Sequence, residues 1–398
     1  MRLYRVSGDK EVLGQTISGI GCDPRSVPIF NGKSEIVPVV IRGAKQSIAV
    51  IVKQEMLSAK GDAAIHREAI TAGVESTDIL FLGTLSCYAD FIRKARAQGY
   101  PTLNAIADEL EHMIAGMTNI PMEWEFRGKS LDLTRPRIMG ILNTTPDSFY
   151  DGGSYNNPDK ALEHCREMIE NGADIIDIGG ESTRPGADPV LSDEELERVI
   201  PVIERIRREH DIPVSVDTYK SEVARKALEA GADIVNDISG LGFDPGMPGV
   251  VAEFDAGAVI MHIAGTPRDM QADPVYGDVI GEIGDYFRER IALAVNSGIK
   301  RSRLVIDPGI GFGKTLEHNR EIIVNLEAFT VFGLPVLIGA SRKSMIGKML
   351  DREPKDRLYG GLGIHAYSYL HGAKLIRTHD VKESKDMLDV LYKLKNFG

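Results

Sequence analysis

The sequence has few of the groups that crosslink a chain or anchor it in a membrane. Its three cysteines, Cys22, Cys87 and Cys165, are far apart and form no CxxC pair. This spacing argues against a disulfide framework or a zinc site and favours a reducing, cytoplasmic setting. No apolar run approaches the ~18 residues of a membrane span. The N-terminal stretch "MRLYRVSGDKEVLG" also lacks the apolar core of a signal peptide.

An excess of basic charge is absent as well. The formal net charge is −11, which argues against nucleic acid as the main partner, although local basic clusters can still bind a small anion. Hydrophobic residues make up 43% of the chain, enough for a large core. A length of 398 residues predicts two or three domains, at roughly 100–200 residues each.

From about residue 136 onward, short apolar runs alternate with amphipathic helical patterns such as 191–210 and 221–231. The predicted strands are 137–143, 174–180, 212–218, 233–239, 258–263, 303–309, 335–341 and 373–380. Eight strand–helix units with strands buried on both faces predict a (β/α)8 TIM barrel. A doubly wound open sheet is the alternative.

Local signals predict where some helices begin and end. Ser192 followed by Glu195 is the pattern of a capping box at the start of the 191–210 helix. "NGAD" at 171–174 and "AGAD" at 230–233 place a glycine where a helix stops and a strand starts.

The first part of the chain follows a different pattern. We predict a small α+β N-terminal domain of unknown role over residues 1–125 and the barrel over 126–398. Strands are expected at 35–43 and 47–57 and helices at 61–71, 87–99 and 102–116. An entry segment with the only tryptophan, Trp124, then leads into the barrel.

Polar side chains lie at the ends of all eight predicted strands, where a barrel of this kind places its active site. They are Asn143, Asp177, Asp217, Asn236 with Asp237, His262 after Met261, Asp307, Ser341 to Ser344, and Arg377 to Asp380. A single buried Asp or Asn is often only a satisfied structural group. Eight together indicate a functional site.

The segment "DPGIGFGKT" (307–315) resembles a phosphate-binding loop only in part. The Walker A pattern requires a glycine at position 308, where Pro308 stands, and Asp307 would bring negative charge near a phosphate. The alternative is a strand that ends in a functional carboxylate, followed by a turn that admits a flat ligand. Lys314 is then either functional or a solvated loop lysine.

The chemistry of the strand ends suggests two neighbouring subsites. Asp217, Asn236, Asp307 and Lys343 could bind the paired N–H donors and the acceptors of a fused heterocycle. The second subsite is a set of donors suited to phosphate oxygens, namely Asn143, Arg184, Arg377 and His379. Alternatively, the Asn143 amide oxygen faces a hydrated Mg2+ bound to diphosphate. The helix that begins near Ser344 suits a carboxylate.

Seven motifs in order over about residues 131–398 resemble the dihydropteroate synthase family. They are "ILNTTPDSFYDGG", "GGESTRPGA", "VDT", "ND", "DPGIGFGKT", "GASRKSMIG" and "IRTHDV". The resemblance implies condensation of 6-hydroxymethyl-7,8-dihydropterin diphosphate with 4-aminobenzoate, giving 7,8-dihydropteroate and diphosphate in folate biosynthesis. It also implies Mg2+ as cofactor and pairing of barrels into a homodimer. The stretch 362–376 would form the dimer contact or pack as an ordinary core helix.

The resemblance assigns roles residue by residue. The pterin would be held by Asp217, Asn236, Asp307, Lys343, Met261 and Arg377. The diphosphate and arylamine would meet Thr183, Arg184, Pro185, Phe312, Ser344 and His379. Asn143 would face the metal, and the catalytic groups would be Asn143, Arg377, His379 and Lys343. The "TTPDSF" segment and the segment with Thr183 would form two mobile loops. No residue of these motifs has the setting of a covalent nucleophile, so a dissociative reaction is expected.

Three other functions are weighed against this one. A corrinoid-linked methyltransferase barrel also binds a pterin, but it has no need of the "ESTRPGA" and "SRKS" segments. A non-catalytic pterin-binding protein would not need the anion-site residues. An aminobenzoate that carries a ribosyl phosphate remains an alternative amine.

Overall fold

The computed structural model describes residues 3–4, 6, 8, 10–144, 158–184 and 186–396. It forms two compact units that divide between Thr118 and Asn119. Each unit has its own hydrophobic core.

The second unit is a closed barrel of eight parallel strands. They are β6 (Arg137–Asn143), β7 (Ile175–Gly179), β8 (Val214–Asp217), β9 (Ile234–Asp237), β10 (Gly257–Met261), β11 (Leu304–Asp307), β12 (Val336–Ile338) and β13 (Ala373–Thr378). Leu375 of β13 pairs with Arg137 of β6, which closes the ring. The predicted (β/α)8 barrel is therefore confirmed, with all eight strands, and the open sheet is wrong.

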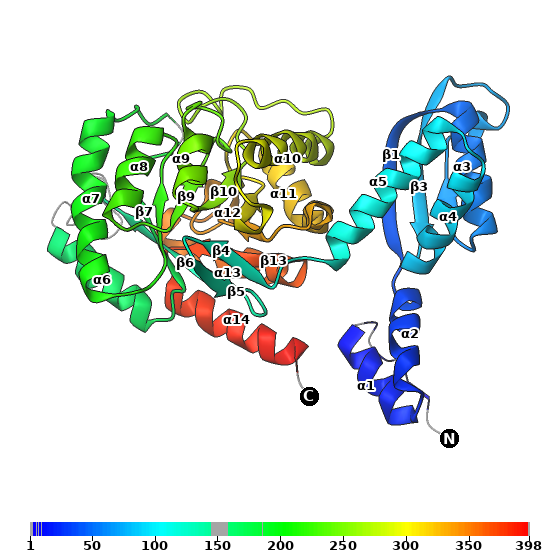
Figure 1. Ribbon diagram of the computed structural model, residues 1–398, viewed down its shortest axis with the longest axis horizontal. Coiled ribbons are helices and arrows are strands. Elements are labelled where there is room, and N and C mark those ends of the chain that lie inside the picture. The colour runs from blue at the N-terminus through cyan, green and yellow to red at the C-terminus, as the bar shows by residue number, and fades with distance from the viewer. Residues whose placement is uncertain are drawn as a thin grey trace. The chain divides into compact units, whose positions relative to one another are not determined.

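Helices surround the strands (Figure 1). They are α6 (Pro158–Glu170), α7 (Ser192–Glu209), α8 (Ser221–Ala230), α9 (Met247–Glu253), α10 (Val279–Asn296), α11 (Leu316–Val324), α12 (Ser344–Leu350), α13 (Leu358–Leu370) and α14 (Val381–Lys395).

The helix-stop glycines are where the sequence places them. Gly172 and Gly231 have φ of 96° and 115°, a left-handed conformation that favours glycine. The predicted capping box of α7 is wrong. Leu191 is the N-cap residue and no side chain caps this helix. The Glu195 carboxylate is instead buried in the barrel unit, where it accepts a hydrogen bond from Lys220 Nζ.

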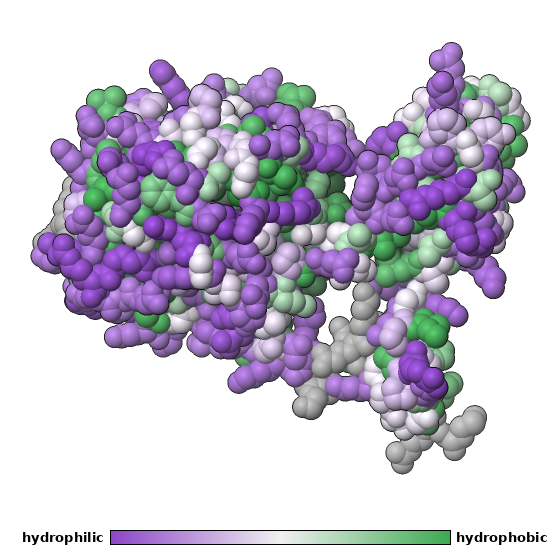
Figure 2. All heavy atoms as spheres, viewed as in Figure 1, coloured by the Kyte–Doolittle hydropathy of each residue, from purple (hydrophilic) through white to green (hydrophobic). Residues whose placement is uncertain are grey.

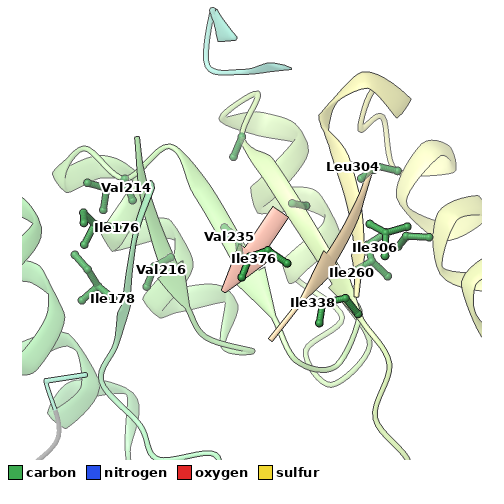
Figure 3. Close-up of a cluster of buried hydrophobic side chains, with 14 of the residues drawn as sticks. Ile176, Ile178, Val214, Val216, Val235, Ile260, Leu304, Ile306, Ile338 and Ile376 are labelled. Atoms are coloured by element: carbon green, nitrogen blue, oxygen red, sulfur yellow. The ribbon is translucent and has the colours of Figure 1, made fainter. Parts of the chain in front are cut away.

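Alternation along the strands separates two apolar layers. Figure 3 shows side chains such as Ile176, Val216 and Ile306, which belong to the core cluster between the barrel and its helices. The neighbouring positions, such as Ile175 and Val305, point inward and form a separate buried cluster at the start of the strands. Successive side chains of a strand point to opposite faces, so this separation follows from the sequence.

A hairpin closes the barrel at the amino ends of its strands. It consists of β4 (Glu123–Phe126) and β5 (Lys129–Asp132). Trp124 and Phe126 are fully buried in the inward cluster, and Trp124 Nε1 donates to the carbonyl oxygen of Arg303 at 2.9 Å. With that end filled, the opposite, carboxyl end of the strands is left for a ligand.

The N-terminal unit is an open-faced α+β layer, as predicted. Its sheet has the order β1 (Val37–Lys45), β3 (Ser76–Gly83), β2 (Asp62–Ala64), all antiparallel. Its helices are α1 (Lys10–Ile20), α2 (Val27–Ser34), α3 (Gln46–Ser58), α4 (Leu85–Ala97) and α5 (Pro101–Thr118). The last three share a core with the sheet.

Two expectations for this unit are wrong. Residues 47–57 form helix α3 and not a strand, since Ala49, Val52 and Met56 are buried at helical spacing against the sheet. Residues 61–71 form β2 and a short 3-10 turn at Arg67–Ala69, not a helix. In both cases packing on the sheet overrides local propensity, which favours strands for β-branched residues and helices for alanine.

Hydrophilic side chains dominate the face of the barrel unit that Figure 2 shows, with small, scattered hydrophobic patches between them. Of the helices that the structure describes, none has the length and apolarity needed to cross a membrane. Cys22, Cys87 and Cys165 are free thiols.

Candidate active site

The inward positions at the carboxyl ends of the strands carry polar groups. They lie two residues beyond the inward apolar layer, so Ile234 is followed by Asn236 and Val305 by Asp307. Asp217 of β8 is paired in register with Asn236 of β9. Because residues two apart on a strand point to the same face, these side chains all point into the carboxyl end of the barrel.

Arg377 stands at the centre of this group. Its Nε donates to Asp177 Oδ2 and its Nη2 donates to Asp217 Oδ2, both at 2.6 Å. Asn236 Nδ2 also donates to Asp177 Oδ2, at 3.0 Å. Asp177, which the residue-by-residue assignment omitted, thus links Arg377 to Asn236. Its signal in the sequence was a charge inside the otherwise apolar strand "IIDIG".

Burial disfavours the charged form of the carboxylates in this cluster. It raises the pKa of Asp217 to about 7, with a further rise from Asp177, while the nearby Arg377 opposes the shift. Burial also raises the pKa of Asp307, against the pull of Lys343. Paired N–H donors of a ligand would lower the pKa of these carboxyl groups again, because hydrogen bonds stabilise the charged form.

Lys343 and an apolar wall lie beside the carboxylates. Lys343 Nζ donates to the carbonyl oxygen of Ile310 and lies 4.5 Å from the ring centre of Phe312. Burial lowers its pKa to about 8. Phe312 packs on the cluster that contains Met261 and Met270. A polar edge next to an apolar wall suits a flat ring with polar rim atoms.

The glycine loop packs tightly on the segment that follows β10. Gly309 has a φ of 69°, and a Cβ atom at this position would lie 1.9 Å from the carbonyl oxygen of His262. Its N–H donates to Asp307 Oδ1 at 2.7 Å. The glycines therefore allow backbone to approach backbone, and the loop in turn holds the Asp307 carboxylate.

Lys314 is buried beneath this loop, so the solvated-lysine interpretation is wrong. Its Nζ lies 2.9 Å from His262 Nδ1 and 2.9 Å from the carbonyl oxygen of Phe312, to which it donates. A phosphate-binding loop would present this lysine to the ligand. Here the lysine ties the loop to the end of β10.

Two of the four residues predicted for the anion subsite, Arg377 and His379, lie at the carboxyl end of β13. His379 Nδ1 is 3.1 Å from Ser341 Oγ. Burial, with added repulsion from Arg342, Arg377 and Arg184, lowers the pKa of His379 to about 3, so its imidazole is neutral.

The remaining predicted residues vary in exposure. Asn143 ends β6 and is half-buried, as is Thr183, whereas Arg184 and Ser344, the first residue of α12, are exposed. Pro185 and most of the "TTPDSF" segment lie outside the described residues.

The closed barrel with polar groups at the carboxyl ends of its strands defines a (β/α)8 barrel enzyme. Residues 139–379 match the family described as "Pterin binding enzyme". The dihydropteroate synthase of Escherichia coli K12 is 48% identical over 265 residues, which cover 67% of this chain and 94% of that protein. The chain belongs to the dihydropteroate synthase family.

Two further comparisons bear on the two units. The structure of Xanthomonas albilineans dihydropteroate synthase with 4-aminobenzoic acid is 44% identical, with a TM-score of 0.66, and covers 70% of this chain and 99% of that chain. A probable bifunctional folylpolyglutamate synthase/dihydropteroate synthase of Halobacterium salinarum is 42% identical over 336 residues. These are 84% of this chain, more than the barrel unit alone, and 40% of that protein.

Proposed function

We propose that this protein joins 6-hydroxymethyl-7,8-dihydropterin diphosphate to 4-aminobenzoate, releasing diphosphate and forming 7,8-dihydropteroate for folate biosynthesis. The observation that carries this proposal is the hydrogen-bonded cluster of Arg377 with Asp177, Asp217 and Asn236 at the carboxyl ends of the barrel strands, where Asp307 also ends β11. The match to the dihydropteroate synthases supports the same reaction.

In this proposal the ring edge of the pterin binds the buried carboxylates. Asp307 and Asp217 accept hydrogen bonds from the ring N–H groups. Asn236 forms a hydrogen bond to the ring edge, and Lys343 donates to the ring acceptors. Met261 and Phe312, which share one apolar cluster, form the wall beside the ring. Arg377, which now bridges two carboxylates, would lie against the ring face and toward the diphosphate.

The diphosphate would lie beside Arg377 and His379. Arg377 supplies charge, and the neutral imidazole of His379 keeps one N–H to donate to an oxygen of the leaving group. Both groups are fixed before the reaction, His379 by Ser341 and Arg377 by Asp177 and Asp217. Stabilisation of the departing charge by fixed donors is the main catalytic effect expected here.

The residues present fit a Mg2+ that arrives with the diphosphate. No three His, Cys, Asp or Glu side chains of the described ranges form a metal site. Asn143, at the carboxyl end of β6, offers one amide oxygen. A Mg2+ that keeps most of its waters and binds substrate phosphates needs no more than one or two protein ligands. When bound, it supplies positive charge next to the diphosphate.

The reaction is dissociative in this proposal. The bond between the exocyclic methylene carbon of the pterin and the diphosphate oxygen breaks first, and the electron pair leaves with the diphosphate. The arylamine nitrogen then attacks the methylene cation and loses a proton. The protein contributes position and electrostatic stabilisation. Cys165 cannot act as a nucleophile here, because it lies buried in α6.

The arylamine would bind beside the pterin ring. In this proposal Phe312 lines its slot, Ser344 receives its carboxylate, and Thr183 and Arg184 lie next to it. The structure of the Xanthomonas enzyme with 4-aminobenzoic acid supports this amine.

Incubation with the pterin diphosphate and competing amines tests the proposal. We expect dihydropteroate, identified by mass, and stoichiometric diphosphate when 4-aminobenzoate is supplied. Preference for the ribosyl-phosphate derivative would change the substrate but keep the reaction. Pterin binding without diphosphate release would mean that the protein is a non-catalytic binder.

We also propose that two barrels pair in the cytoplasm. Leu370, Val390 and Leu394, on α13 and α14, are exposed by 46%, 59% and 65%. Gly361, His365 and Ser368, on another face of α13, are buried in the barrel unit. One face of α13 therefore packs in the core, and its other face, together with α14, exposes apolar side chains that could contact a second barrel. Sedimentation of the wild type should give a dimer mass, and a monomer at micromolar concentration would contradict the proposal.

A further inference from the structure

Three residues beyond Asp217, Lys220 forms a buried ion network. Its Nζ donates to Glu181 Oε2 and to Glu195 Oε2, each at 2.5 Å, and to the carbonyl oxygen of Val190 at 2.6 Å. The three donors of an ammonium are therefore all used. Glu195 comes from α7, and the other two partners come from the segment that follows β7.

Two of these partners stand at the two ends of the segment 182–189, which carries Thr183 and Arg184. Glu181 precedes the segment and Val190 follows it. Glu181 Oε2 also accepts from the Val190 N–H at 3.3 Å, and Glu181 Oε1 accepts from the Tyr219 hydroxyl at 2.7 Å. The two ends of the segment are thus joined to each other and to Tyr219 and Lys220, which directly follow Asp217 and Thr218.

The network is costly, which argues that it does more than fill space. The side chains of Glu181, Glu195 and Lys220 are only 6%, 1% and 15% exposed. Burial raises the pKa of Glu195. Although burial opposes it, the two carboxylates raise the pKa of Lys220, so the ammonium stays charged. Buried ion groups often contribute little net stability, and one attested use is to fix a single arrangement of the chain.

We propose that Lys220 is a positioning residue that holds the segment 182–189 in register with the pterin-binding end of β8. Asp217 and Lys220 belong to one short stretch of chain, so the ring subsite and the covering segment share one support. The expected effect of this positioning on the binding of 4-aminobenzoate rests on the proposed function. The physical link between Lys220 and the segment does not depend on it.

Hydrogen exchange tests the link without any substrate. Lys220→Met alone would leave two buried carboxylates without a cation, so the test variant is the double substitution Lys220→Met with Glu195→Gln, which leaves only Glu181, a carboxylate that keeps the Tyr219 hydroxyl and the Val190 N–H as donors. We expect amide exchange in 182–190 to speed up about tenfold or more, while the barrel strands keep their protection. Lys226→Met is the matched control, because Lys226 lies in α8, the helix that directly follows Lys220, is 54% exposed and pairs with Glu229. Unchanged exchange in 182–190 would overturn the proposal.

Kinetics test the functional consequence. The double variant should bind 6-hydroxymethylpterin with wild-type affinity by calorimetry, while its KM for 4-aminobenzoate rises or its kcat falls by about tenfold to a hundredfold, as misplacement of a substrate-contacting group predicts. Equal losses in pterin affinity and arylamine KM would indicate a merely structural role and would overturn positioning. If the wild type makes no dihydropteroate, the proposed function fails, and the exchange measurement still decides the role of Lys220.

Discussion

Arg377 holds the carboxylate of Asp217, with Nη2 2.6 Å from Oδ2. Asp217 is also a proposed acceptor for the pterin edge, so the ring has to share or replace this partner. An arginine released from Asp217 remains bonded to Asp177 through Nε. Arrival of the pterin would thereby free donors of Arg377 for the diphosphate that the same substrate carries.

Pterin affinity should depend on pH with two limbs. The buried carboxyl of Asp217 has its pKa raised to about 7, so below that pH it is protonated and loses its strength as an acceptor. The pKa of Lys343 is lowered to about 8, so above that pH its charged donor is lost. Calorimetric affinity should therefore be highest between these two values. Asp217→Asn should weaken the acid limb, to which Asp307 also contributes, and leave the alkaline limb unchanged. A wild-type affinity that does not change across both values would contradict the assignment.

Asp307→Ala should abolish measurable pterin binding. A hydrogen bond to a charged group contributes about 1.5–3 kcal/mol, and two such bonds are lost, so we expect a decrease of about 100-fold or more. Calorimetry with 6-hydroxymethylpterin measures it. Asp285→Asn, an exposed position on α10, is the control and should bind like the wild type. Wild-type affinity in the Asp307 variant would refute its role.

Arg377→Ala should mainly slow the departure of diphosphate. Removal of one fixed donor from a developing anion costs about 100-fold to 1,000-fold in rate, which a single-turnover measurement of diphosphate release will show. Loss of the cation should also raise the pKa of Asp217 further and move the acid limb of pterin binding to higher pH. Arg208→Ala, on the exposed face of α7, serves as control. An unchanged single-turnover rate would remove Arg377 from the chemistry.

Lys314→Met should destabilise the barrel unit. The substitution leaves the carbonyl oxygen of Phe312 and the ring nitrogen of His262 without their buried partner, so we expect a loss of about 1–3 kcal/mol in the free energy of unfolding. Urea denaturation measures it. Lys300→Met, at an exposed position, should stay within about 0.5 kcal/mol of the wild type. Equal stability of both variants would mean that the Lys314 contacts contribute nothing.

The barrel could be predicted because its signals are local and repeated. Runs such as 174–180 are apolar on both faces and are bounded by glycines, and the charges at 217, 307 and 377 fall at their ends. The N-terminal unit was harder. Its run 47–57 is rich in Ile and Val, as strands are, but it packs one side on a sheet, and only the burial of Ala49, Val52 and Met56 reveals the helix.

By itself, then, the sequence determined the eight strands, the polar residues that end them and the family to which they belong. Only the tertiary structure decided which partners those residues take: Asp177 beneath Arg377, Lys314 under the glycine loop, and Lys220 between two glutamates. The reason is that residue spacing along a strand fixes which face a side chain points to. The ion pairs join strands and helices far apart in the chain, and their geometry exists only once the barrel has closed.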